Sequence, residues 1–368
     1  MDRKDDSSFK QDMDAGNFTI GDLGEKGFLD IFFNKVSLDD SKFLNGLNQD
    51  AGVVRIKDET LLVSNVDKSQ TPVILSEDPS TYQAWGFLAV TSSLSDVAVV
   101  GGKGISFLLS LTVPDNVRAD YVLNIIQGAK NACEFYQLPF VGGDTKKGKD
   151  IVVIGIANGI IDNQQYLTRH GSKVGDYIVM TNTIGNFAAI SHKLNTKLKI
   201  TDEEYKYVMY PKFDRDTLNF VSDNLNLFSA SMDNSDGINN VLKKMLLENG
   251  LGYRINLDNL PYGEYAINIS KQKNIPLENF AFYVGDWNSI FTISKENYEK
   301  LDSLNKLNFK IIGEVIVNPR NSYFYKSKNI YNFNNSYQND SFNSTLSKSF
   351  LENVIVKNTS LLRKKNGL

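Results

Sequence analysis

Hydrophobic and polar positions follow two spacings along this chain, and the two alternate in the order of a mixed α/β protein. Apolar residues recur every three or four positions in some segments, which predicts amphipathic helices; elsewhere they run together or alternate, which predicts strands. In the first part, helices are predicted at 23–36, 81–100 and 119–136, and strands at 52–56, 61–64, 105–113, 138–141 and 151–161.

A second α/β series follows a polar, glycine-containing stretch at 162–175. Its helices are predicted at 186–194, 201–209, 214–220 and 238–249, and its strands at 177–180, 227–232, 253–257, 281–284, 288–293 and 309–317. We therefore predict two α/β domains, 19–165 and 166–318, after a disordered lead at 1–18. Residues 319–368 are predicted to form an Asn-rich tail. Renewed apolar spacing at 349–362 predicts a docked helix within that tail.

Composition limits the classes of function. The chain has 368 residues, enough for two domains, and its net charge of -3 gives no reason to expect nucleic acid or an acidic membrane as partner. One cysteine, Cys133, and two histidines exclude an intramolecular disulfide and a Cys/His zinc site of the usual spacing. No stretch approaches the ~20 apolar residues of a membrane span. We expect a cytoplasmic protein.

Common catalytic motifs are missing. The chain contains no G-x-x-x-x-G-K-[ST] phosphate loop, no G-x-G-x-x-G after a strand and no G-x-S-x-G elbow. With His170 and His192 as its two histidines, a Ser-His-Asp triad has no positional support.

Aspartates at the predicted ends of strands and helices are the remaining candidates for chemistry. Mg²⁺ prefers oxygen ligands, and adjacent glycines let backbone N–H groups approach a phosphate. Asp96 lies inside a run of small and apolar residues, where a carboxylate needs a donor or a cation. Taken alone, Asp144 in GGDT and Asp236 in DNSDG are as well explained as turn residues, and Asp236 as a helix N-cap.

Six short segments, in order, resemble one family. Each is weak alone, but their order and spacing are typical of the superfamily of aminoimidazole-ribotide synthetase, thiamine-monophosphate kinase, selenophosphate synthetase and the hydrogenase-maturation dehydratase. The chain looks most like thiamine-monophosphate kinase. The segments are LSDVAVVG at 94–101, GGDT at 142–145, RHGSKVGD at 169–176, DNSDGI at 233–238, FT at 291–292 and IGEV at 312–315.

The resemblance implies a two-domain fold whose N-terminal mixed sheets pair across a homodimer into a β-barrel, with ATP and Mg²⁺ in a cleft between subunits and domains. It implies roles for matching residues. Asp96 and Asp144 would be catalytic by anchoring metals on the ATP phosphates. The implied metal ligands are Asp50, Asp96, Asp144, Asp233 and Asp236. The implied ATP contacts are Gly142, Gly143, Thr145, Arg169 and Ser235. The implied substrate contacts are Asp67, Asp286 and Trp287.

The chain departs from the family pattern in the acceptor half. N-Q-D-A at 48–51 replaces G-D-D-A, S-N-V-D at 64–67 replaces S-T-D, and T-P-V at 71–73 replaces a segment with a substrate histidine. The leading hypothesis is an ATP- and Mg²⁺-dependent phosphotransferase acting on a small phosphorylated acceptor. Two alternatives stay open: a synthetase or dehydratase that phosphorylates an amide oxygen, and a nucleotide-binding protein without catalysis.

Overall fold

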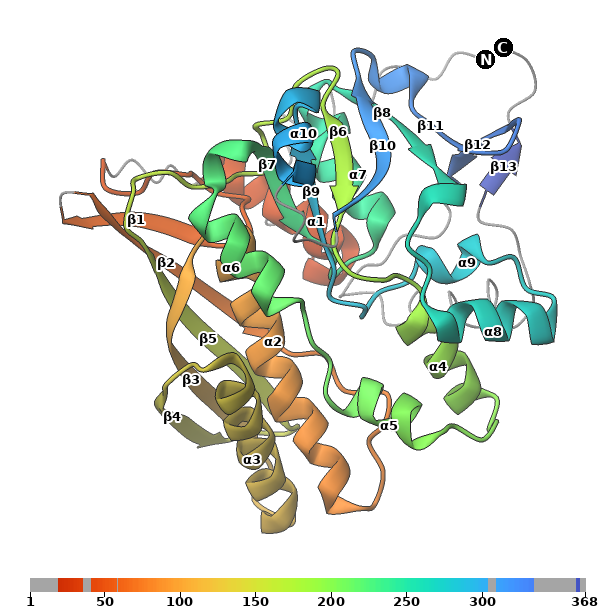
Figure 1. Cartoon of the computed structure of the whole chain (residues 1–368). Coiled ribbons are helices and arrows are strands. Elements are labelled where there is room, and N and C mark those ends of the chain that lie inside the picture. Colours follow the sequence, from red (N-terminus) through yellow and green to blue (C-terminus); the bar gives the residue numbers. More distant parts are fainter. Residues whose placement is uncertain (1–18, 36–40, 58, 304–308, 334–361, 365–368) are drawn as a thin grey trace.

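Two β-sheets with helices packed against them make up the molecule (Figure 1). The structure is a computed structural model that describes residues 19–35, 41–57, 59–303, 309–333 and 362–364. The helices of the first part are α1 (Ile20–Lys35), α2 (Gln83–Val99) and α3 (Ala119–Tyr136). Those of the second part are α4 (Asn186–Asn195), α5 (Asp202–Met209), α6 (Arg215–Asp223), α7 (Ile238–Met245), α8 (Glu264–Lys273), α9 (Glu278–Ala281) and α10 (Lys295–Ser303).

The first sheet has five strands in the order β1-β2-β5-β3-β4. Its strands are β1 (Gly52–Lys57), β2 (Thr60–Lys68), β3 (Lys103–Val113), β4 (Phe140–Lys147) and β5 (Val152–Ile161). Buried and half-buried residues alternate strictly along β5, as expected when one face of a sheet is covered. Helix α2 contacts β2, β3 and β5 on that covered face, and α3 packs on α2.

Helices α2 and α3 approach each other more closely than side chains would allow. A Cβ atom at Gly86 would lie 1.7 Å from the carbonyl oxygen of Ile125, and one at Gly128 would lie 1.9 Å from that of Gln83. Glycine is therefore required at both positions. The close packing of α2 against α3 explains why small residues occur in α2. The crossing sets how α2 lies on the sheet, and α2 carries Asp96.

The second sheet has eight strands in the order β13-β12-β11-β8-β10-β6-β9-β7. Its strands are β6 (Tyr177–Met180), β7 (Phe228–Asp233), β8 (Gly252–Asn256), β9 (Ser289–Ile293), β10 (Lys310–Ile316), β11 (Tyr323–Lys326), β12 (Asn329–Phe333) and β13 (Leu362–Lys364). Residues of α4, α7, α8 and α9 share a core with one face. Residues of α6 and α10 share another core with the opposite face.

One hydrophobic core joins the two sheets. Residues of α2, α3 and the first sheet lie in the same cluster as Val179 and Phe291 of the second. Two further contacts cross the same junction. The hydroxyl of Ser231 donates a hydrogen bond to the carbonyl oxygen of Val99 at 2.7 Å, and the rings of Tyr136 and Phe213 stack. The C-terminal end of α2 is thereby held against β7, the strand that ends at Asp233.

Most predicted elements are confirmed, and two predictions in the first part need correction. The helix predicted at 81–100 begins as a 3₁₀ turn, Pro79–Tyr82, and continues as α2. The strand predicted to end at Val141 runs on to Lys147, so the GGDT segment is extended strand and not a turn. It remains extended because β4 pairs in parallel with β3, with Asp144 opposite Ser110.

Two predictions in the second part were wrong. The strand predicted at 281–284 is the end of α9 and the turn that follows it, because its apolar side chains pack from a helical turn into the core. The tail predicted after Pro319 contributes β11, β12 and β13 to the sheet. Phe324 anchors it, buried against the rings of Tyr253 and Phe282. The predicted lead at 1–18 lies outside the described residues, as does the predicted terminal helix up to residue 361.

Cys133 is buried in α3, and burial raises the pKa of its thiol to about 12. It is therefore not a nucleophile at neutral pH. Among the residues that the structure describes, no helix has the length and apolar character needed to cross a bilayer.

Candidate active site

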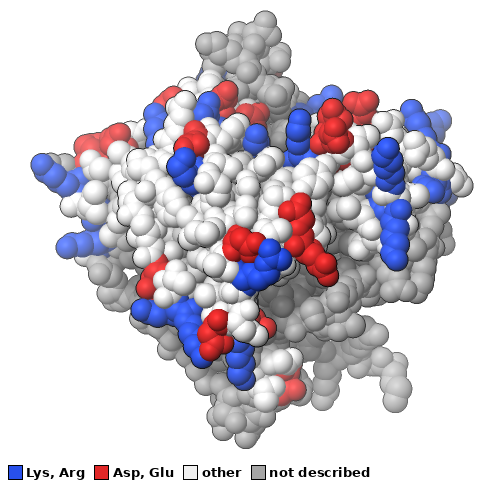
Figure 2. All heavy atoms as spheres, turned by 90° about the horizontal axis from the view of Figure 1, so that it is seen from below, with Lys and Arg blue, Asp and Glu red and all other residues white. Residues whose placement is uncertain are grey.

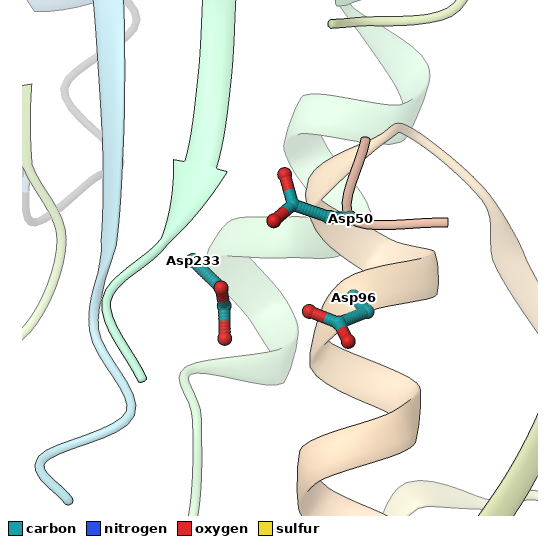
Figure 3. A group of neighbouring side chains, drawn as sticks. All are labelled: Asp50, Asp96 and Asp233. Atoms are coloured by element: carbon teal, nitrogen blue, oxygen red, sulfur yellow. The ribbon is translucent and has the colours of Figure 1, made fainter. Parts of the chain in front are cut away.

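Three carboxylates from distant parts of the chain converge at the junction of the two sheets. Asp50 lies in the loop before β1, Asp96 on the last turns of α2, and Asp233 at the end of β7; Figure 3 shows their side chains turned toward one another. One oxygen atom from each lies within 4.8 Å of the others. These are three of the five residues that the family resemblance implies as metal ligands.

The local backbone places each of these carboxylates. The Asn45 carboxamide ties the loop before β1 together: its Nδ2 donates to the carbonyl oxygen of Ala51 at 2.7 Å, and its Oδ1 accepts from the Val53 amide at 2.9 Å. Asp233 is paired with Ser289 of β9 and is buried. Asp96 is half-buried on α2, whose position is set by the crossing with α3.

Arg169 is the cation of the site. Its side chain is buried, and its Nη2 and Nε atoms donate to Oδ1 of Asp50 at 2.5 and 3.2 Å. Its Nη1 donates to the carbonyl oxygen of Asn48 at 3.1 Å, and its backbone amide donates to Oε1 of Gln49 at 2.9 Å. The segment that departs from the family's G-D-D-A thus has a definite role here, because it supplies the acceptors that hold Arg169 beside Asp50.

The electrostatics show that negative charge is in excess at the junction. Burial, followed by the charges of Asp233, Asp50 and Asp67, raises the pKa of Asp96 well above its usual range, and Arg169 only partly opposes this. Burial and Asp50 raise the pKa of Asp233 to about 8, against a lowering by a hydrogen bond from Ser235. The three carboxylates therefore need either protons or a cation beyond Arg169.

A magnesium ion fits this donor set. Every candidate ligand is a hard oxygen, the type that Mg²⁺ prefers, and three carboxylates around one guanidinium leave room for a divalent charge. One further buried oxygen, Oδ1 of Asn65, has no hydrogen-bond partner among the described residues. Sequence reasoning missed Asn65. Asn65 lies two residues after Val63, in a strand whose alternate residues Leu61 and Val63 are buried, and that spacing was the signal that it faces α2.

Three other predicted residues lie near the convergent group without belonging to it. Asp67 is half-buried on β2, close enough to Asp96 to raise its pKa. Ser235 is half-buried and hydrogen-bonds to Asp233. Asp236 is exposed, accepts from Nδ2 of Asn240 at 2.9 Å and adds to the charge acting on Asp233. It is not the N-cap of α7, a place that Gly237 takes.

The GGDT residues are not brought to this group within one chain. Gly142, Gly143, Asp144 and Thr145 are exposed on β4, the edge strand of the first sheet. The Asp144 side chain is 62% exposed and pairs with Lys146 at 3.4 Å, while Lys147 pairs with Asp115. Gly143 has a structural reason to be glycine, because a Cβ there would lie 1.8 Å from the carbonyl oxygen of Leu109.

Asp286 has a different place from the one expected of a substrate contact. It is buried, and its two oxygens accept from the backbone amides of Gly185 and Phe187 at 2.6 and 2.8 Å and from the Tyr207 hydroxyl at 3.0 Å. It therefore holds the N-terminus of α4. Burial raises its pKa to about 6 against these hydrogen bonds. Trp287, next in the chain, is half-buried and packs against the core that joins the sheets.

One family model matches the part of the chain that forms the first sheet. The family described as "AIR synthase related protein, N-terminal domain" matches residues 48–161. This range contains Asp50, Asp96 and all five strands of the first sheet. The predicted resemblance to the AIR synthase-related superfamily is confirmed.

Members of this superfamily match most of the chain. A thiamine-monophosphate kinase from Pyrococcus abyssi is 27% identical over 274 residues, covering 74% of this chain and 83% of its own. One from Aquifex aeolicus is 28% identical over 282 residues, covering 76% and 89%. The solved structure of AaThiL complexed with AMPPCP and TMP superimposes with a TM-score of 0.71 at 23% identity, covering 84% of this chain and 95% of that one. The predicted AIR-synthase-like fold is confirmed.

Proposed function

We propose that this chain is an ATP- and Mg²⁺-dependent kinase that transfers the γ-phosphate of ATP to thiamine monophosphate. The convergence of Asp50, Asp96 and Asp233 beside Arg169 carries the proposal, because it supplies a Mg²⁺ site without any covalent nucleophile. Relatives that match more than four fifths of their own length are named thiamine-monophosphate kinase, which supports this acceptor. A related structure holds AMPPCP and TMP together.

The residues of this site act by position and charge. When bound, Mg²⁺ would neutralise the charge of the ATP phosphates, and Asp50, Asp96 and Asp233 would hold it. Arg169 holds Asp50 in place through two donors on one oxygen. The ATP contacts expected of Arg169 and Ser235 remain predictions, since both side chains hydrogen-bond to members of the carboxylate group.

The acceptor side of the site differs from the expectation. Both Asp286 oxygens are taken by donors at the N-terminus of α4 and by Tyr207, so we assign Asp286 to positioning that helix. Substrate contacts by Asp67 and Trp287 stay predictions. Where the family has a substrate histidine, this chain has Pro72 and Val73, followed by the buried Ile74, which packs against α2 and α4.

We infer that the chain works as a homodimer formed through the open face of the first sheet. The side chains of β5 that point away from α2 are half-buried and mostly apolar, among them Ile154, Ile156 and Ile160. Ile56 and Val66 on the neighbouring strands are 55% and 67% exposed. An apolar sheet face of this kind is typical of an interface, and the family resemblance implies that two such sheets close a barrel.

The same proposal includes no nucleic acid or membrane as partner and places the enzyme in the cytoplasm, with its substrates. The net charge of -3 supports this. On the face seen from below in Figure 2, lysine and arginine side chains lie beside acidic ones and do not gather into one patch.

The test is product formation by the purified full-length protein with ATP, Mg²⁺ and thiamine monophosphate. We expect thiamine diphosphate and ADP in equal amounts, and a loss of about 100-fold or more in kcat in the variants Asp96→Asn and Asp233→Asn. Asp216→Asn is the matched control, because Asp216 is 83% exposed on α6. ADP formation that does not depend on thiamine monophosphate, or no thiamine diphosphate at all, would reject this acceptor.

A further inference from the structure

Asn65 lies on β2 directly beside the carboxylate group, and one end of its carboxamide is tied to two of its members. Its Nδ2 donates to the backbone oxygen of Asp50 at 2.8 Å and to Oδ2 of Asp96 at 2.8 Å. Alternate side chains of β2 face α2, and the two before it, Leu61 and Val63, are fully buried. On the face of β2 that α2 covers, the polar side chain of Asn65 therefore follows two apolar ones and lies next to Asp96.

The oxygen of the same carboxamide has no hydrogen-bond partner in the described part of the chain. This atom, Oδ1 of Asn65, is buried. Its orientation is determined by chemistry, because turning the amide over would set Oδ1 against two acceptors, the Asp50 carbonyl and the Asp96 carboxylate. Since the two atoms share one carbon, Oδ1 lies at most about 5 Å from Oδ2 of Asp96.

We propose that Oδ1 of Asn65 is a further oxygen ligand of the divalent cation held by Asp50, Asp96 and Asp233; this rests on the metal site of the proposed function. Carboxamide oxygens are among the ligands that hard cations take. A neutral ligand would add a coordinating oxygen without adding a fourth negative charge to a site where negative charge is already in excess. The Nδ2 bond to Oδ2 of Asp96 also leaves that residue's other oxygen for the cation.

Two variants separate a ligand from a residue that only donates to Asp96. Asn65→Leu keeps the size of the side chain and removes both the oxygen and the donor. Asn65→Asp keeps an oxygen at the same place and removes the donor. If the oxygen binds the cation, the aspartate variant retains affinity and the leucine variant loses it. If Asn65 acts only as a donor, both variants lose affinity alike.

Asn297→Leu is the matched control. Asn297 is a half-buried asparagine on α10, and its Nδ2 donates to the carbonyl oxygen of Leu227 at 3.0 Å. It has the same chemistry and is likewise half-buried, and its hydrogen bonds go to residues outside the carboxylate group and outside the open face of the first sheet.

The experiment is a titration of each full-length variant with Mn²⁺, in which free Mn²⁺ is measured by electron paramagnetic resonance with and without AMPPCP. We expect Asn65→Leu to bind Mn²⁺ about tenfold more weakly than the wild type, a loss typical of altered metal surroundings. We expect Asn65→Asp to bind at least as tightly as the wild type at about pH 8, and Asn297→Leu to be unchanged. Circular dichroism in EDTA checks folding, and Asn65→Ala replaces the leucine variant if that one does not fold.

Wild-type affinity in Asn65→Leu would overturn the assignment, as would equal losses in the leucine and aspartate variants. The wild-type protein separates this inference from the proposed function. If it makes thiamine diphosphate and the Asn65 variants bind Mn²⁺ unchanged, only the role of Asn65 fails. If the wild type neither binds Mn²⁺ nor forms product, both fail.

Discussion

Carboxylates and amides have divided roles at the residue scale. Asp50, Asp96 and Asp233 bring the charge, and Asn48, Gln49 and Asn65 hold the groups around them through hydrogen bonds. The segments around Asn48 and Asn65 depart from the family's motifs, yet both contact the site. The first departure, N-Q-D-A for G-D-D-A, removes one negative charge from the junction, and the amides at both places hold its side chains.

The charge excess predicts an unusual dependence of stability on pH. Burial and Asp50 raise the pKa of Asp233 from 3.8 to about 8 in the folded protein. The folded state therefore holds a proton that the unfolded state releases, so the free energy of unfolding falls as pH rises from about 4 to about 8 and is level above that. Without divalent cations, we expect the protein to be about 1–3 kcal/mol less stable at about pH 9 than at about pH 6.

Urea denaturation in EDTA at the two pH values measures this difference. The variant Asp233→Asn should lose part of it, because an amide has no proton to release, while Asp96, whose pKa is also raised, keeps the rest. Added Mg²⁺ should stabilise the wild type more at the higher pH and should stabilise the variant less than the wild type. An equally steep fall in the variant would show that Asp233 is not the group responsible.

At the scale of elements, the position of α2 decides whether the site forms. Its crossing with α3 depends on Gly86 and Gly128, and Asp96 lies about three turns along the same helix. The other end of α2 packs against β7, which carries Asp233. A shift of this one helix would separate two of the three carboxylates.

Gly86→Ala is the corresponding test. The added Cβ would lie 1.7 Å from the carbonyl oxygen of Ile125, so α2 and α3 must move apart. We expect a loss of about 1–3 kcal/mol in the free energy of unfolding and a weaker response of the melting temperature to Mg²⁺. Gly21→Ala in α1 is the control, since its nearest atom would be 3.7 Å away. Unchanged stability and Mg²⁺ response in Gly86→Ala would contradict this account of the crossing.

At the scale of the whole molecule, one chain does not complete the predicted site. Asp144 is exposed on an edge strand and stands apart from the convergent carboxylates, although the family motif implies it as a metal ligand. The open apolar face of the same sheet is where we place the second subunit. Asp144 of one subunit and Asp233 of its partner would then belong to the same active site.

Mixing two inactive variants tests this arrangement. Asp144→Asn and Asp233→Asn homodimers should each be inactive, but unfolding and refolding them together should produce mixed dimers with one intact site. We expect roughly a quarter of wild-type activity, since half of the dimers are mixed and each holds one complete site out of two. No recovery from demonstrated mixed dimers would show that Asp144 does not act across the interface, and an active Asp144→Asn homodimer would remove it from the site.

Particular elements show how far sequence reasoning reaches. The hairpin of β1 and β2, helix α3 and the strands β3 and β5 follow from hydrophobic spacing, because each buries one regular face. The segment 281–284 was wrongly predicted as a strand, because a short apolar run can also pack into a core from a helical turn. β11 was missed because the polar composition around it masked a short run of aromatic residues, Tyr323-Phe324-Tyr325. In the site, motif order selected Asp50, Asp96 and Asp233, but it also selected Asp286, which caps a helix.

The sequence by itself determined the resemblance to the superfamily, the alternation of helices and strands and the oxygen-ligand chemistry of the site, because these depend on local spacing and on short motifs in a fixed order. Only the tertiary structure decided which aspartates meet, that Arg169 neutralises Asp50 and that Asn65 faces Asp96. Those facts depend on how α2 lies between two sheets, and that position is set by contacts between residues far apart in the chain, which no local pattern records.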